Sequence, residues 1–177
     1  MTRLQIDDSL VRRIVRELPR SDAGSGRPLA TLVEQLLDRQ PELLAFLLAG
    51  TAQLAAETRS VGLQLASVIF ESFRLAGRTT RAVPTGSFVA ALKENRDIAF
   101  RVGQAHDRFA ERYLKNSNTL HQPALIRYAT SVLLDHDESC PHSISREELG
   151  PLFIILKSII DVLDEDAATQ MVPSLPV

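Results

Sequence analysis

The chain has 177 residues, of which 45% are hydrophobic and 24% are charged. This length and composition are typical of one globular domain with its own core, so we expect residues 1–177 to form a single domain. The formal net charge of −2 argues against a protein built mainly to bind nucleic acid. The one cysteine excludes an intrachain disulfide and a metal site made of several thiolates.

Hydrophobic residues recur at helical spacing along almost the whole chain. A first helix is expected over residues 8–18, ended by Pro19, so that residues 1–19 form an N-terminal helical segment. Residues 20–27 are small and polar and predict a flexible linker. Pro28 suits the first turn of a second helix that ends near Arg39.

The strongest helical pattern begins at Pro41 and continues to Ala76, where Gly77 is expected to end the helix. Its polar positions alternate at steps of four and three and form one narrow stripe of Gln53, Glu57, Ser60, Gln64, Ser67, Glu71 and Arg74. The pattern predicts a long central helix over about 42–76, with this stripe as its one solvated edge.

The other faces of this predicted helix are apolar or small, and include Leu65 and Val68. Gly50 and Gly62 would allow a neighbouring helix to approach closely. A helix with so little polar surface is typical of the inner member of a bundle. The alternative is that its wide apolar face forms the seam of a homodimer.

A fourth helix is expected over residues 87–115, with two polar side chains, Asn95 and His106, in an otherwise apolar stripe. They lie about 16 Å apart along the helix axis. A buried polar group without a partner costs about 1–3 kcal/mol, so we expect each to be hydrogen-bonded. Alternatively, Asn95, His106 and Tyr113 line an internal ligand pocket.

A fifth helix is expected over residues 122–134. Ser145 and Glu148 have the spacing of a capping box, which predicts the start of the last helix. Pro151 starts or interrupts that helix, which is expected to end near Asp166.

The segment between the fifth and last helices carries oxygen donors at alternate positions, namely Asp135, Asp137 and Ser139. Glu148 follows Ile144 by four residues. This segment resembles the calcium loop of EF-hand proteins, and the resemblance implies that the three donors are early ligands and that Glu148 is the closing bidentate ligand of Ca²⁺. The loop spans fourteen residues, and Cys140 stands where the family has glycine. The alternative is an acidic, solvated loop before a capped helix.

Motifs of several enzyme classes are missing from the sequence. None of the four histidines has an acidic residue three positions before it, as a carboxylate-bridged di-metal bundle requires. The chain also lacks a phosphate-binding Gly-Lys-Ser/Thr, a His-Glu-x-x-His and a Gly-x-Ser-x-Gly. These absences favour a protein that acts by binding rather than by catalysis.

We therefore predict an all-α, single-domain bundle of five or six helices over residues 28–168, with a loose tail at 169–177. The longest uncharged stretch, residues 43–56, is too short to span a membrane, and the first residues have no apolar run of signal-peptide length. We expect a cytoplasmic, non-enzymatic protein without a cofactor that acts through protein contacts and self-associates. The alternatives are a calcium-responsive module and a small-molecule-binding bundle.

Overall fold

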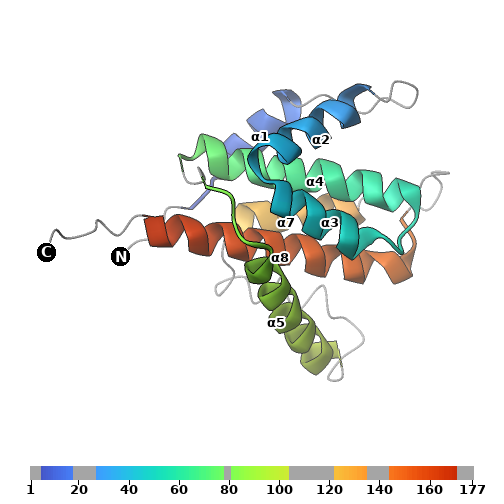
Figure 1. The fold of residues 1–177 in the computed structure, drawn as a ribbon. Coiled ribbons are helices and arrows are strands. Elements are labelled where there is room, and N and C mark those ends of the chain that lie inside the picture. Colours follow the sequence, from blue (N-terminus) through green and yellow to red (C-terminus); the bar gives the residue numbers. More distant parts are fainter. Residues whose placement is uncertain (1–4, 18–26, 78–80, 104–121, 135–143, 171–177) are drawn as a thin grey trace, which may run out of the picture.

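The computed structural model describes residues 5–17, 27–77, 81–103, 122–134 and 144–170. Within these ranges the backbone forms seven helices and no strand, which confirms the predicted all-α class (Figure 1). The helices are α1 (Asp8–Glu17), α2 (Arg27–Arg39), α3 (Pro41–Thr51), α4 (Ala56–Leu75), α5 (Thr85–Gly103), α7 (Pro123–Leu134) and α8 (Arg146–Gln170). Among the described residues, no helix has the length and hydropathy needed to cross a membrane.

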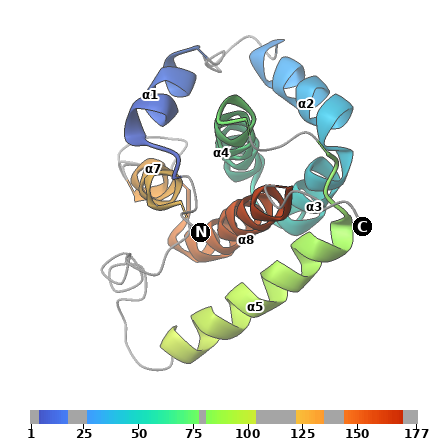
Figure 2. The ribbon, with the colours of Figure 1, turned by 90° about the vertical axis from the view of Figure 1, so that its left-hand side faces the viewer.

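The helices pack in a bundle in which α8 lies between α4 and α5. Figure 2 shows α4 nearly end-on, with α1, α2, α3, α7 and α8 arranged around it and α5 on the far side of α8. One continuous hydrophobic core joins all seven helices of the described chain. Its aromatic members include Phe46 and Phe88, whose rings stack with their centroids 5.3 Å apart. The described residues form seven helices rather than the predicted five or six, because the region predicted as one long helix forms two.

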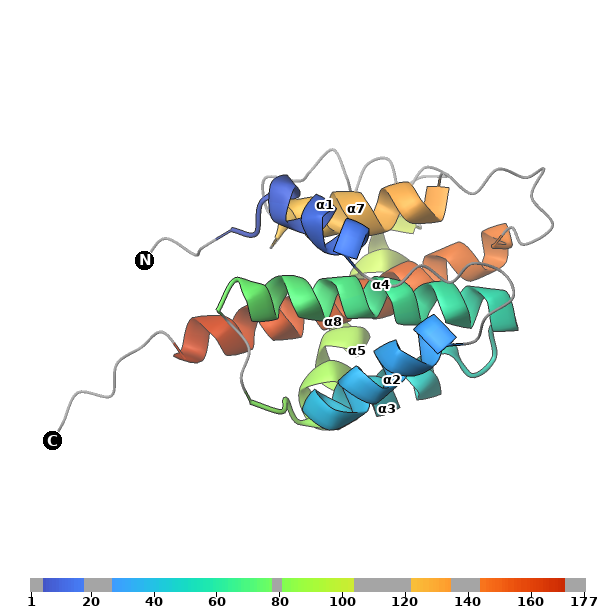
Figure 3. The ribbon, with the colours of Figure 1, turned by 90° about the horizontal axis from the view of Figure 1, so that it is seen from above.

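The prediction of a single helix over about 42–76 is wrong, because the chain leaves helical conformation between Thr51 and Ala56. Figure 3 shows α3 and α4 as separate rods that run in different directions. The intervening residues contain no proline or glycine, so no local signal marks the break. The break is stabilised from outside, because the backbone N–H of Ala55 donates to Glu148 Oε1, 93 positions away, at 2.6 Å.

On α4 the predicted polar stripe is solvated only in part: Glu57 is exposed, Ser67 is buried, and the other members are half-buried, namely Ser60, Gln64, Glu71 and Arg74. Leu65 and Val68 are buried, as expected for the apolar side of an inner helix. Ser67 belongs to the stripe by spacing, yet it is buried too, and its hydroxyl donates to the Leu63 carbonyl at 2.8 Å. This bond to the preceding turn satisfies the hydroxyl and lets a serine occupy a core position.

Two glycines bring α3 and α4 close to α8, as their positions predicted. A Cβ atom built on Gly62 would lie 3.0 Å from Leu152 Cδ1, and one on Gly50 would lie 3.1 Å from Ile155 Cδ1. Few real Cβ atoms have neighbours this near, so a side chain at either glycine would require Leu152 or Ile155 to shift by a few tenths of an ångström. The apolar face of α4 is thus covered by helices of the same chain.

The remaining helix boundaries agree with the sequence within a few residues. Gly77 has a φ of +72° and follows α4, where it ends the helix as predicted. Pro151 lies inside α8 rather than at a start or an interruption, and α8 extends to Gln170 rather than to Asp166. Most of the predicted linker, the second half of the predicted fourth helix and most of the predicted tail lie outside the described residues.

Candidate functional site

A buried polar cluster lies where α5 crosses α8, and it contains Asn95, one of the predicted site residues. Phe88, which precedes Asn95 on the predicted stripe of α5, is buried in the core, and Leu92 packs against it. The same face therefore carries Asn95 inward, and only 7% of this residue is exposed. The partners of Asn95 come from α8.

The cluster consists of four side chains joined by hydrogen bonds, namely Asn95, Lys157, Ser158 and Asp161. Asn95 Nδ2 donates to Asp161 Oδ2 at 2.9 Å and to Ser158 Oγ at 3.2 Å. Lys157 Nζ donates to the same Asp161 Oδ2 at 2.5 Å and to Asn95 Oδ1 at 3.4 Å. The prediction that Asn95 is buried and hydrogen-bonded is confirmed.

The sequence of α8 places these partners on one side of the helix. Lys157 and Asp161 are four positions apart, so they lie one above the other on the same face. Ser158 Oγ also donates to the carbonyl of Ile154 at 2.8 Å, which leaves its lone pairs directed toward Asn95. The cluster is thus built from one turn of α8 and one residue of α5.

The electrostatics of the cluster are those of an ion pair removed from water. Lys157 is only 7% exposed, and its Nζ meets the carboxylate of Asp161 directly. Burial of such a pair costs several kcal/mol per ion in desolvation, which the pair repays only with good geometry and additional hydrogen bonds. Asp161 Oδ1 is buried and has no hydrogen-bond partner among the described residues, which hold the carboxylate through Oδ2.

The structure tests only part of the predicted ligand pocket. His106 and Tyr113 lie outside the described residues, so the pocket of Asn95, His106 and Tyr113 stays a prediction.

The sequence analysis did not single out Lys157 and Asp161, although a signal for them was present. A lysine and an aspartate four positions apart interrupt the apolar run of α8, at positions that its helical period places in the core.

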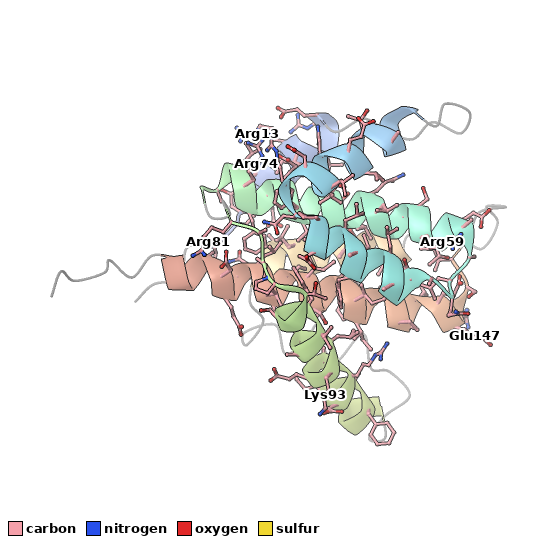
Figure 4. The ribbon with its side chains drawn as sticks, viewed as in Figure 1. Arg13, Arg59, Arg74, Arg81, Lys93 and Glu147 are labelled. Atoms are coloured by element: carbon pink, nitrogen blue, oxygen red, sulfur yellow. The ribbon has the colours of Figure 1, made fainter. Side chains whose placement is uncertain are left out.

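Glu148, the predicted closing ligand of calcium, connects the N-termini of two helices. Its Oε1 accepts the N–H of Ala55 at 2.6 Å, and its Oε2 accepts the hydroxyl of Thr58 at 2.7 Å. Ala55 is the N-cap residue of α4 and has no side chain to cap the helix, so Glu148 supplies the missing acceptor. Arg59 and Glu147 mark this end of the molecule in Figure 4.

These hydrogen bonds stabilise the charged form of Glu148. The Ala55 N–H and then the Thr58 hydroxyl lower the pKa of the Glu148 carboxyl below its ordinary value of 4.5, and contacts with Ser145 act in the same direction. The Ser145 contacts agree with the predicted capping box at the start of α8. Glu148 therefore caps its own helix and, across the bundle, α4.

The other predicted calcium ligands, Asp135, Asp137 and Ser139, lie outside the described residues. Within the described part of the chain, no three His, Cys, Asp or Glu side chains are grouped in a way that could hold a metal ion. Calcium binding stays a prediction, and it would require the carboxylate of Glu148 to exchange its present hydrogen bonds for the ion.

A second buried polar contact, which the sequence did not indicate, joins the N-terminal segment to α7 and α8. Gln122 Nε2 donates to Asp164 Oδ1 at 2.5 Å, and Gln122 Oε1 accepts the N–H of Ile6 at 2.8 Å. Gln122 has a φ of +53°, which is uncommon for a residue with a side chain. Its contacts are all within the fold, so we assign it a structural role.

The outward side of α5 is a second surface of interest. Val89 is 55% exposed and Phe100 is 67% exposed, and they lie on one stripe of the helix about 16 Å apart along its axis. Lys93 lies between them in sequence, on the part of α5 that extends away from the other helices (Figure 4). We call Val89, Lys93 and Phe100 the outer stripe of α5.

Comparison with known protein families, with curated proteins and with solved structures finds no match. Any function assigned to this chain therefore rests on its own geometry.

Proposed function

We propose that this chain is a non-enzymatic helical protein that acts through contacts with other protein molecules, and that it self-associates through the outer stripe of α5. The observation that carries the proposal is the exposure of Val89 and Phe100 on one side of a helix whose other side is docked on the bundle. Because Val89 and Phe100 lie on the same side of α5, one partner surface laid along this helix would cover both.

The apolar side of α4, which the sequence offered as a dimer seam, is not free for this purpose. Leu65 and Val68 are buried within the chain, and Gly62 lies against Leu152 of α8. Self-association therefore needs another surface. The outer stripe of α5 is suitable because Val89 and Phe100 are exposed, whereas Asn95 of the same helix is bonded to α8.

The charges around this stripe favour contact with protein rather than with nucleic acid. Lys93 and Arg96 are exposed beside Glu94 and Asp97, so two basic and two acidic side chains balance one another. A nucleic-acid surface would instead concentrate basic residues. A protein interface commonly contains polar side chains of both signs beside its apolar contacts.

Sedimentation velocity over a range of concentrations tests the proposal. We expect the wild-type protein to dimerise, and we expect Val89→Ser combined with Phe100→Ser to weaken dimerisation by about a hundredfold. Both protomers carry the change, so the dimer loses four apolar side chains, and about 0.7 kcal/mol from each, for partial burial, accounts for this factor.

Leu134→Ser is the matched control, because Leu134 is 57% exposed on α7, away from α5. It should leave the dissociation constant unchanged. A wild-type protein that stays monomeric at every concentration, or a double variant that dimerises as well as the wild type, would contradict self-association through α5.

A further inference from the structure

The cluster between α5 and α8 contains the three functional groups that an intramolecular amide exchange requires. Lys157 supplies a primary amine, Asn95 supplies a carboxamide, and Asp161 supplies a carboxylate that touches both. Lys157 Nζ lies 3.4 Å from Asn95 Oδ1, so the electrophilic Cγ is one C=O bond away from this contact. The amine and the carboxamide are thus already in contact in the folded chain, which removes the entropic cost of bringing two reactants together.

We propose that Lys157 and Asn95 form an isopeptide bond that ties α8 to α5, with Asp161 as the catalytic acid and base. The product is a secondary amide between Nζ and Cγ, and the leaving group is ammonia. This self-modification does not depend on the proposed self-association, because all reacting groups belong to one chain.

Asp161 is placed to move the protons of each step. Its Oδ2 accepts a proton from the Lys157 ammonium, and the neutral amine then attacks Cγ of Asn95. The protonated carboxyl next gives its proton to Asn95 Nδ2, 2.9 Å from the same oxygen, and the Cγ–Nδ2 bond breaks. Oδ2 takes the second proton from Nζ as the new amide forms. One amine and one carboxamide thus give one amide and one ammonia, with no oxidant or reductant.

The orientation of the Asn95 amide is set by its surroundings. The nitrogen faces two acceptors, Asp161 Oδ2 and Ser158 Oγ, whereas the oxygen faces the ammonium of Lys157, which can only donate. The carbonyl is therefore turned toward the nucleophile, and the leaving nitrogen is turned toward the proton source. Ser158 acts as a positioning residue for the leaving group.

Burial of the cluster favours amide formation between Lys157 and Asn95. Asn95 and Lys157 are each 7% exposed, so little water reaches the carbonyl and amide formation has little competition from hydrolysis. The exchange also ends the desolvation cost of a buried ion pair, because the amine becomes an uncharged amide nitrogen and Asp161 ends protonated. The unpartnered Oδ1 of Asp161 agrees with a carboxylate whose other oxygen is shared between two reacting groups.

Intact mass spectrometry of the full chain, after incubation in the folded state, tests the proposal. We expect a mass lower than the sequence mass by that of one ammonia molecule. After complete tryptic digestion, residues 94–96 should be linked to residues 147–177, since the modified Lys157 is no longer a cleavage site and no later Lys or Arg exists.

Three variants test the roles of Lys157 as nucleophile and of Asp161 as acid and base. Asp161→Asn and Lys157→Arg should both keep the unmodified mass, the second because a guanidinium keeps the charge but is not the nucleophile. Lys115→Arg, which changes the one lysine outside both the cluster and the outer stripe of α5, should retain the mass loss. Circular dichroism verifies that each variant is folded. If Asp161→Asn does not fold, Lys157→Arg alone tests whether the link requires the lysine amine.

A folded wild-type chain at its full sequence mass would overturn the proposal. A mass loss that maps to residues other than Asn95 and Lys157 would overturn it equally. Formation of the same link in folded Asp161→Asn would remove Asp161 from the chemistry.

Discussion

Helix α8 meets its two neighbours, α4 and α5, by different chemistry. Toward α4 the contact is apolar and close, with Gly62 of α4 against Leu152 of α8. Toward α5 the middle of the contact is polar, with Asn95 bonded to Ser158 and Asp161. Helix α8 therefore packs against α4 through close apolar contact and against α5 through a hydrogen-bonded ion pair.

This difference decides how each contact responds to change. An apolar contact loses free energy in proportion to the volume that is removed or forced in, and neighbouring side chains can adjust. A buried polar cluster depends on every member, because the loss of one leaves another desolvated without a partner. We expect the α5 contact to be the more specific of the two and the more sensitive to a single substitution.

The largest effect is expected from Lys157→Met, which keeps most of the side-chain volume but removes the charge. In the chain before any amide forms, the Asp161 side chain, which is 17% exposed, would then face no cation, and the loss of one partner of a mostly buried pair costs about 3 kcal/mol. Urea unfolding followed by circular dichroism measures this change. Arg81→Met, at an exposed position just before α5, is the control and should change stability by less than about 0.5 kcal/mol. Equal effects of the two variants would remove the distinction drawn between the two sides of α8.

A smaller loss is expected from Gly62→Val on the apolar side. Its Cβ would lie 3.0 Å from Leu152 Cδ1, and the added methyl groups would force α4 and α8 apart, at a cost of about 1–3 kcal/mol. Gly86→Ala is the matched control, since a Cβ there meets nothing within 4 Å. The midpoint of thermal unfolding should fall for the first variant and not for the second. A Gly62→Val protein as stable as the wild type would show that this close approach is not required.

The smallest effect concerns the end of the α4–α8 contact, where Glu148 caps both helices. The pKa of Glu148 is lowered in the folded protein, so its contribution is complete above the unfolded value of 4.5 and is lost as the pH falls through the folded pKa. Because the group is partly exposed, we expect this contribution to be about 1 kcal/mol.

Glu148→Gln tests the pH dependence directly. The wild type should be more stable than this variant at neutral pH, and the difference should shrink as the solution is acidified below the ordinary carboxyl range. Parallel urea titrations at several pH values give the difference. A stability gap that stays constant with pH would mean that the charge of Glu148 does not contribute.

Local sequence signals predicted those parts of the fold that depend on neighbours along the chain. The helical period located the helices, Gly77 ended α4, and the capping box placed the start of α8. The break between α3 and α4 was not predictable in this way, because the group that stabilises it, Glu148, is 93 positions from Ala55. The polar stripe begins at Gln53, inside the break, and mostly apolar residues precede it, so the pattern gave no sign that the helix stops there.

The candidate site was likewise predictable from the sequence only in part. Helical spacing indicated that Asn95 turns inward, and hydrogen-bonding requirements indicated that it needs a partner. The identity of that partner depended on how α5 crosses α8, which follows from packing and not from either helix alone. Lys157 and Asp161 looked like an ordinary ion pair at helical spacing until the fold placed them in the interior.

The sequence by itself determined the all-α class, most helix boundaries and the inward faces, because these follow from the helical period and from residues a few positions apart. The tertiary structure alone decided that Glu148 caps α4 and that an amine, a carboxamide and a carboxylate meet between α5 and α8. Contacts between distant residues are set by the packing of the whole chain, so no local pattern of residues can specify them.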